Sequence, residues 1–556
     1  MNVLMTLARI ALVLAPLALA AQDSSGLSSK TPDGRLAPLL ANLGSLHMPI
    51  TTSNADTQKY FDQGIRLIYG FNHAEALRSF REAARNDDSC AMTYWGQALA
   101  LAPNINDSAI GPDREQQGYN AIQEAVKRRN QASDREKALI DALAARFTAK
   151  PPKGNRKALN QAYAKAMEKA WRRFPKDPDV AVLYADAVMN TQPWNYWFKG
   201  NKPKPGVANA RKALEQTIQA VPDHPGALHT YIHLMEASDF VDLAVPSADH
   251  LGPLMPGAGH LVHMPSHIYI RVGRYGDAAS ANIKAVAADE DYITQCRVQG
   301  IYPATYYPHN IHFLAAALVM EGRGKEAMET AQKAAHHHGD DVPEGLMGFA
   351  QLLEALPRLV MIRFGMWDQV LASPAPDDKH SFVAAVHHFA RGMAFSANGK
   401  AAEAKEELAL TETLAKRPEL KDQKILDLNS LADIAQIGIA MLRGDIAVKA
   451  GQYDAAVAAF QKAVELDGAL LYSEPPDWFI PPRQYLAQAY LAAGKAADAE
   501  RVYRADLNQH RENGWSLRGL EESLRKQGKS AEADQTHKNF EQAWQRSDVQ
   551  LASSRF

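Results

Sequence analysis

One pattern of small and aromatic residues returns along this chain and restricts the folds open to it. A small residue is followed after 12 positions by alanine, after 4 more by an aromatic residue and after 3 more by alanine. The pattern occurs at Gly64, Ala76, Phe80 and Ala83 and again at Gly444, Ala456, Phe460 and Ala463. Glycine-containing turn sequences such as AGQYDA and AAGKAADA interrupt the helical stretches, and no segment keeps the alternation typical of strands. We therefore predict an all-α chain of helix-turn-helix units.

The segment from Tyr60 to Ala84 resembles a unit of the tetratricopeptide repeat (TPR) superfamily. The resemblance covers most of residues 57–545, with degenerate copies in the middle of the chain. It implies a right-handed α-solenoid in which small residues lie where the two helices of a unit cross. It also implies that the first helix of each unit lines a concave groove. The usual function of such a groove is to bind a protein or peptide partner.

The N-terminus has the features of a secretory signal over residues 1–20. Arg9 precedes a short apolar stretch, and residues 18–20 fit the small-x-small cleavage pattern. Pro16 interrupts the stretch, so an uncleaved membrane anchor is the less favoured alternative. We expect an exported bacterial protein, periplasmic or secreted, with no stable membrane span after cleavage.

The remaining chain divides by sequence character into five parts. Residues 21–54 are polar and expected to be loosely ordered, and three blocks of repeats precede a short tail. The blocks are N-terminal repeats at 55–200, central histidine-rich repeats at 201–345 and C-terminal repeats at 346–545. The tail is at 546–556. Segments 103–135, 190–206 and 289–308 depart from the repeats. The last two are rich in aromatic residues and flank the histidines, which suits either a functional insertion or packing on the solenoid edge.

The composition excludes some classes of protein. Hydrophobic residues make up 46% of the 556 residues and charged residues 22%, which is typical of a folded protein. A net charge of -2 provides no broad basic surface for nucleic acid. With only Cys90 and Cys296, two separate buried thiols are favoured over a disulfide bridge.

Two histidine pairs repeat in step with the architecture. His229 and His233, like His263 and His267, have i,i+4 spacing, and the pairs are 34 residues apart, the length of one TPR unit. Such a pair shares one helix face and can present two nitrogens to one metal ion. Because packed helices lie about 8–10 Å apart, facing pairs could share an ion. These four residues are the leading metal-ligand candidates.

Further polar residues fall in register with the pairs. His260, His309 and His312 are second-rank ligands, while Asp186 and Glu236 are candidates to orient imidazoles or to act as a general base. Nitrogen and oxygen ligands suit a transition metal such as zinc, iron or copper, with nickel and manganese also compatible. The supply of ligands could support two ions.

Three functions remain open from these residues. The first is a metal-dependent enzyme, the second a non-catalytic TPR interaction scaffold, and the third a metal-binding carrier. In the alternative interpretation without a metal, the histidines are hydrogen-bonded core residues or part of a peptide-binding groove. The chain has no HExxH, Walker or GxGxxG motif and no Ser-His-Asp signature, so the sequence names no reaction.

Overall fold

The computed structural model describes residues 31, 34–108, 110–150, 156–198, 200–296, 301–336, 342, 344–377, 379–425 and 428–556. The signal predicted at residues 1–20 lies outside these ranges. Cys90 is buried and is a free thiol, while the side chain of Cys296 lies outside the described part. None of the described helices combines the length and the apolar character that crossing a bilayer requires.

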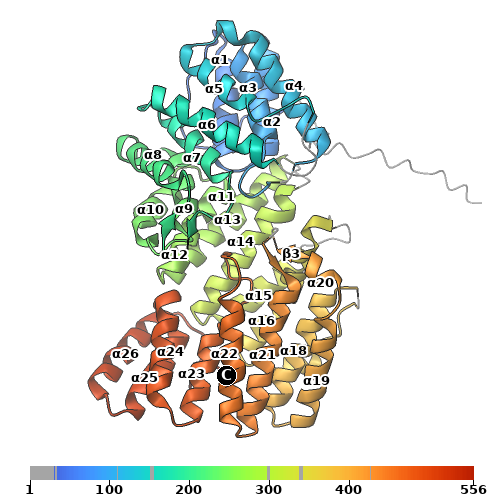
Figure 1. Cartoon of the computed structure of the whole chain (residues 1–556), viewed down its shortest axis with the longest axis vertical. Coiled ribbons are helices and arrows are strands. Elements are labelled where there is room, and N and C mark those ends of the chain that lie inside the picture. The colour runs from blue at the N-terminus through green and yellow to red at the C-terminus, as the bar shows by residue number, and fades with distance from the viewer. Residues whose placement is uncertain are drawn as a thin grey trace, which may run out of the picture.

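Paired helices form the N-terminal part of the molecule (Figure 1). The helices are α1 (Ala55–Tyr69), α2 (His73–Asn86), α3 (Ala91–Leu101), α4 (Pro112–Arg128), α5 (Asp134–Ala144), α6 (Lys157–Arg173) and α7 (Pro178–Met189), with a short 3-10 helix at Arg129–Gln131.

The central part adds shorter helices and one small hairpin. Its elements are β1 (Trp197–Phe198), β2 (Lys202–Pro203), α8 (Val207–Ala220), α9 (Pro225–Met235), a 3-10 helix at Val241–Ala244, α10 (Val245–Leu251), α11 (Gly259–His263), α12 (Pro265–Arg271), α13 (Tyr275–Cys296), α14 (Ile301–Met320) and α15 (Gly324–Ala335). The predicted insertion at 289–308 is thus largely helical, because α13 and α14 extend into it.

The C-terminal part returns to regular helix pairs. Its elements are a 3-10 helix at Glu344–Leu346, α16 (Met347–Arg363), α17 (Trp367–Ala372), α18 (Ser381–Ala397), α19 (Ala401–Leu414), α20 (Glu419–Asp422), β3 (Lys424–Ile425), β4 (Asn429–Ser430), α21 (Leu431–Lys449), α22 (Tyr453–Asp467), α23 (Pro482–Ala492), α24 (Ala496–Gln509), α25 (Gly514–Lys526) and α26 (Ser530–Ala543). The two hairpins, β1–β2 and β3–β4, are antiparallel with strands of only two residues. The chain is therefore an all-α solenoid of helix-turn-helix units, as predicted.

The small and aromatic residues of the repeat meet where the helices cross. The ring of Phe80 lies between Gly64 of α1 and Gly96 of α3, and a β-carbon at either glycine would come within 2.5 Å of that ring. Phe460 takes the same place against Gly444. A larger residue at these glycines would force the helices apart, which explains the spacing seen in the sequence.

Residues 34–54 of the segment before α1, which the structure describes, are packed instead of loosely ordered. Its backbone amides at Leu36, Leu40 and Met48 donate to side-chain oxygens of α1 and α2. Leu43 and Met48 are fully buried. The polar composition of this segment gave no sign of its packing, because a few apolar side chains and backbone hydrogen bonds suffice to hold it.

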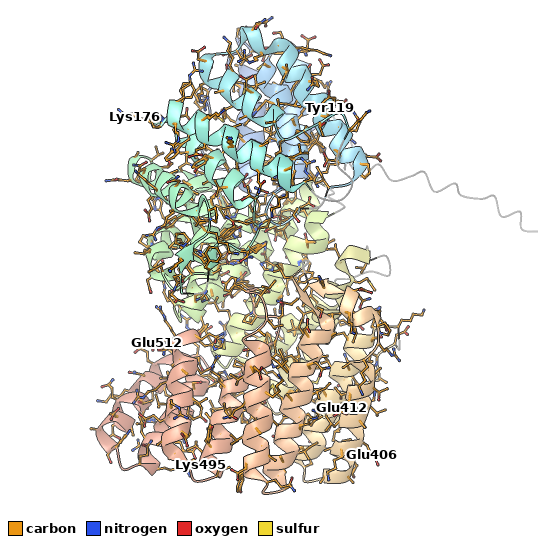
Figure 2. All side chains as sticks on the ribbon, viewed as in Figure 1. Tyr119, Lys176, Glu406, Glu412, Lys495 and Glu512 are labelled. Atoms are coloured by element: carbon orange, nitrogen blue, oxygen red, sulfur yellow. The ribbon has the colours of Figure 1, made fainter. Side chains whose placement is uncertain are left out.

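The C-terminal repeats fold back onto the central ones. The indole nitrogen of Trp515 on α25 donates to the backbone oxygen of Val319 on α14 at 3.0 Å. The hydroxyl of Tyr275 donates to the backbone oxygen of Arg511 at 2.9 Å. These contacts bring the loops and helices of the C-terminal part against the histidine-rich middle. Charged side chains such as Lys176, Glu406 and Lys495 lie on the outer surface (Figure 2).

Candidate metal centre

Six histidines from neighbouring helices converge in the middle of the solenoid. They are His229 and His233 on α9, His260 and His263 on α11, His267 on α12 and His309 on α14. All are buried except His309, which is half-buried. They form two separate groups of three.

The first group joins the earlier pair to a second-rank candidate. His229, His233 and His260 each offer a ring nitrogen, and these nitrogens lie within 4.8 Å of one another. The ring centroid of His229 lies 4.7 Å from that of His233 and 5.0 Å from that of His260. The three side chains could therefore surround one ion.

The second group is tighter. His263, His267 and His309 also place one nitrogen each within 4.8 Å of the others. The Nε2 atom of His263 is 2.8 Å from that of His267 and 3.2 Å from that of His309. The two sequence pairs thus contribute to different groups instead of closing on one shared ion, and each takes its third member from the second rank.

Glu236 connects the two groups from just beyond the end of α9. Its Oε1 accepts from Nδ1 of His233 at 2.7 Å, and its Oε2 accepts from Nδ1 of His267. The carboxyl group is fully buried, and burial raises its pKa against the opposing effect of His233 and Arg271. Because both oxygens are engaged by imidazoles, the geometry favours an orienting role for Glu236 over that of a general base.

Two further contacts determine where the imidazole protons lie. Nδ1 of His229 is 2.7 Å from the backbone oxygen of Tyr69, and Nδ1 of His263 is 2.6 Å from Oδ1 of Asn282. The Asn282 amide nitrogen donates to the oxygen of Ala278, which turns Oδ1 toward the histidine. Both acceptors require a proton on Nδ1, so Nε2 of each neutral ring carries a lone pair.

The remaining nitrogens of the first group have no hydrogen-bond partner in the part of the chain that the structure describes. Nε2 of His229, Nε2 of His233 and both ring nitrogens of His260 are buried without a hydrogen bond to any described residue. Burial lowers the pKa of His229 to about 3 and that of His233 to about 4. It likewise lowers the pKa of His267 to about 3. The rings are therefore neutral near pH 7, the form that coordinates metals.

Phe71 covers the first group and was not anticipated from the sequence. Its ring centroid lies 4.6 Å from His229, 5.6 Å from His233 and 5.3 Å from His260. Phe71 lies five residues before Ala76, and Gly451 holds the same turn position before Ala456. Both residues have a left-handed backbone conformation, with a φ of 57° at Phe71. A bulky residue where other units carry glycine is a sequence signal that could have revealed it.

Two of the irregular segments also reach the first group. Trp194, with φ of 61°, places its ring edge-on to His233 at 5.3 Å. Asn106 donates to the hydroxyl of Tyr306, whose ring lies 4.8 Å from that of His260. The segments 190–206 and 289–308 thus bring the rings of Trp194 and Tyr306 against the first group, and segment 103–135 contacts Tyr306 through Asn106.

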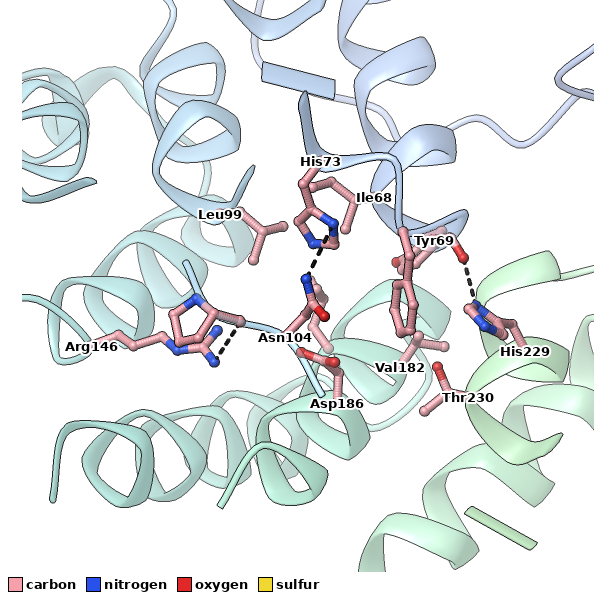
Figure 3. A pocket seen from close by; sticks show the side chains of 13 residues that line it. Ile68, Tyr69, His73, Leu99, Asn104, Arg146, Val182, Asp186, His229 and Thr230 are labelled. Carbon is pink, nitrogen blue, oxygen red and sulfur yellow. Dashed lines mark hydrogen bonds between the residues drawn. The ribbon is translucent and has the colours of Figure 1, made fainter. Parts of the chain in front are cut away.

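Asp186 belongs to neither group. It lines a cavity of about 30 Å³ that also touches Phe71, Arg146 and His229 (Figure 3). Burial raises the pKa of Asp186 to about 6, against the opposing effects of Arg146 and the Asn190 hydrogen bond. A space of this size holds one or two water molecules. Figure 3 shows the His229 ring turned toward the backbone of Tyr69.

His312 also lies outside both groups. Its ring stacks on Phe479 of the C-terminal part, with centroids 6.3 Å apart and planes within 22°. Equivalent repeat positions therefore do not give equivalent roles. Helix α14 presents His309 to the second group and His312 to Phe479 of the C-terminal part.

Comparison with known proteins adds distant structural likenesses. No family model and no curated protein matches the chain. The human IFIT1 dimer with m7Gppp-AAAA is 12% identical, covering 89% of this chain and 91% of that chain with a TM-score of 0.32. The P58(IPK) TPR domain is 12% identical (86% and 99% covered, TM-score 0.22), and yeast Tom70 is 13% identical (87% and 90%, TM-score 0.29). At these scores, the fold rests on the helix pairs described above.

Proposed function

We propose that this protein binds transition-metal ions at two three-histidine sites and uses them for metal-dependent chemistry. One observation carries the proposal. The Nε2 atoms of His263 and His267 face each other at 2.8 Å, while Nδ1 of each ring donates to its own acceptor, Asn282 or Glu236.

This arrangement places two lone pairs head to head. Each neutral imidazole has one proton, and on these rings it is on Nδ1, so no Nε2–H is left to bridge the gap. A cation between the nitrogens removes the repulsion. Metal–nitrogen bonds of about 2.0–2.1 Å imply nitrogen–nitrogen separations of about 3–3.4 Å around one ion. The observed 2.8 and 3.2 Å around His263 are close to that range.

The hydrogen-bond partners of Nδ1 support the same conclusion. Histidines that bind metals commonly donate their other ring nitrogen to a carboxylate or a carbonyl group, which sets the tautomer and the ring orientation. His233 and His267 use Glu236, and His229 uses the oxygen of Tyr69. The orientation is thus built into the folded protein.

The number of ligands favours catalysis over a purely structural site. Structural zinc sites use four protein ligands, whereas catalytic sites use three and keep a position for water or substrate. Each group here offers three histidines. Imidazole ligands suit zinc, copper, iron and nickel, and a bound ion would supply Lewis acidity or an activated water. A carrier or an interaction scaffold is the outcome if no turnover is found.

Metal analysis tests the proposal directly. The purified protein, prepared without chelators, is analysed by mass spectrometry for metal content beside the variants His263→Ala/His267→Ala and His229→Ala/His233→Ala. We expect about two equivalents in the wild type and about one in each variant. The half-exposed His250 provides a control, His250→Ala, that should retain both ions. Equal, near-zero metal in all four proteins would refute the proposal.

We also propose that the protein is exported and processed near residue 20. Its support is the sequence pattern of residues 1–20. The mass of the protein recovered from the periplasm should match a chain that begins near residue 21, and an unprocessed chain in the cytoplasm would contradict export.

A further inference from the structure

A large cavity separates the central repeats from the C-terminal ones. Its volume is about 690 Å³, within the range of pockets that enclose small organic molecules. Helices α12 and α14 form one wall. The connection between α22 and α23, which includes Tyr472, Glu474 and Trp478, forms the other.

Hydrogen bonds to Asn429 of β4 and within the segment hold the α22–α23 connection in place. The side chain of Asn429 accepts from the amide of Leu471 and donates to both the Leu471 oxygen and the Asp477 carboxylate. Ser473 donates to the other oxygen of Asp477 at 2.7 Å. The cavity wall is therefore shaped before any ligand arrives, which lowers the ordering cost of binding.

A guanidinium group and a carboxyl group face this cavity without bonding to each other, and burial raises the pKa of the Glu474 carboxyl to about 7. Arg271 lies over the ring of Tyr472 at 5.4 Å, and the Tyr472 hydroxyl donates to Glu474 at 2.7 Å. Arg271 and Glu474 influence each other's pKa, yet neither joins an ion pair with any residue in the described ranges. A ligand that carries both an ammonium and a carboxylate group would satisfy the two at once.

One part of the cavity lining is suited to an apolar body, while Asp467, Arg483 and His510 also line the cavity. Val319 and Met320 of α14 line it opposite Trp478 and Phe479. Trp478 is buried, and its indole nitrogen contacts the Met441 sulfur, so the ring face is fixed. Aromatic and aliphatic walls with a few charged groups are typical of sites for amphipathic small molecules.

The cavity adjoins the histidine groups through one residue. The guanidinium group of Arg271 donates to the backbone oxygen of Glu236, whose carboxylate contacts His233 and His267. A ligand held by Arg271 therefore lies next to the element that orients both histidine groups.

We propose that this cavity binds a zwitterionic amphiphile of short-peptide size, with its carboxylate on Arg271, its ammonium on Glu474 and its apolar side chains against Trp478. The assignment of this ligand as the substrate of the histidine centre rests on the proposed function; its binding does not.

A panel of apolar dipeptides, led by L-leucyl-L-phenylalanine, tests the site in the full chain by calorimetry and tryptophan fluorescence. Each is compared with its N-acetylated and its C-amidated form, which lack one charge. We expect zwitterionic members to bind with a dissociation constant below about 1 mM and both blocked forms to bind at least about tenfold more weakly. If no zwitterionic member binds at about 1 mM, the proposal fails.

Variants separate charge recognition from folding. Glu474→Gln should weaken binding of the free dipeptide at least about tenfold and leave binding of the N-acetylated form unchanged. Only the free dipeptide has an ammonium group that contacts Glu474. An equal loss for both forms would show a merely structural role and overturn the assignment. Glu406→Gln, at an exposed position of α19 outside the cavity lining, is the matched control and should bind like the wild type.

Measurements on metal-free and metal-loaded protein keep the two proposals distinct. Binding by metal-free protein supports the cavity whatever the metal content proves to be. If metal is present and bound dipeptide leaves the spectrum of a cobalt-substituted centre unchanged, the assigned link through Arg271 and Glu236 is wrong.

Discussion

The ring of Phe71 stacks on that of His233, with centroids 5.6 Å apart and planes within 10°. Phe71 reaches this position from a left-handed backbone conformation, which costs a residue with a side chain about 1–2 kcal/mol relative to glycine. Strain of this kind is commonly retained where it positions a functional group. The histidine group is thus shielded at the expense of a better turn.

Replacing Phe71 tests this shielding role. Phe71→Gly should relax the turn but expose the first histidine group, so bound metal should pass to a chelator at least about tenfold faster. The rate of metal loss to EDTA is the measurement. Phe71→Tyr, which keeps the ring, should behave like the wild type. An unchanged rate in Phe71→Gly would assign the ring a packing role only.

Glu236→Gln should weaken metal binding about 10–100-fold. The amide can accept from only one of the two imidazoles, because its nitrogen is a donor. The other ring must move its proton to Nε2 and lose the lone pair aimed at the metal. Competition with a chromophoric chelator measures the affinity, and Glu326→Gln on the exposed face of α15 is the control. Equal affinities in the three proteins would remove Glu236 from the centre.

Asp186 predicts a specific dependence of stability on pH. Its pKa is about 6 in the folded chain and 3.8 in the unfolded reference. The folded state therefore holds the proton more tightly, and this stabilisation is complete below about pH 4 and is lost as the pH rises to about 6. Across this pH range, the free energy of unfolding should fall by about 3 kcal/mol through Asp186. Between about pH 4 and 7, Asp186→Asn should therefore lose less stability than the wild type in urea unfolding, whereas Asp454→Asn, at an exposed site, should not differ from it. Parallel curves for all three would contradict the buried carboxyl.

The C-terminal tail should contribute measurably to stability through Arg555. Its guanidinium pairs with the buried Asp445 on α21 and lies over the ring of Tyr485 at 4.6 Å. Arg555→Ala leaves the Asp445 charge buried with Ser396 as its one remaining side-chain donor among the described residues, which should cost about 3 kcal/mol. The exposed pair of Lys495 with Asp454 provides the comparison, and Lys495→Ala should cost less than about 1 kcal/mol. The urea midpoint measures both. Similar midpoints for the two variants would show that the tail is only loosely attached.

Much of the candidate centre could be recognised in the sequence. The i,i+4 spacing places His229 beside His233 and His263 beside His267, because one helical turn separates them. Their grouping could not be read there. Whether a pair faces the next pair, a second-rank histidine or a carboxylate depends on how neighbouring helices rotate and cross. Here that rotation brings in His260 and His309 and leaves His312 and Asp186 aside.

The sequence by itself determined the helix-turn-helix solenoid, because the small and aromatic residues act between adjacent helices and leave a periodic record. It also determined which helix faces carry imidazoles. Only the tertiary structure decided that Glu236 connects two histidine groups, that Phe71 covers one of them, and that the α22–α23 connection closes a cavity beside Arg271. These contacts join residues from separate units of the chain, and the curvature of the whole solenoid decides which of them meet.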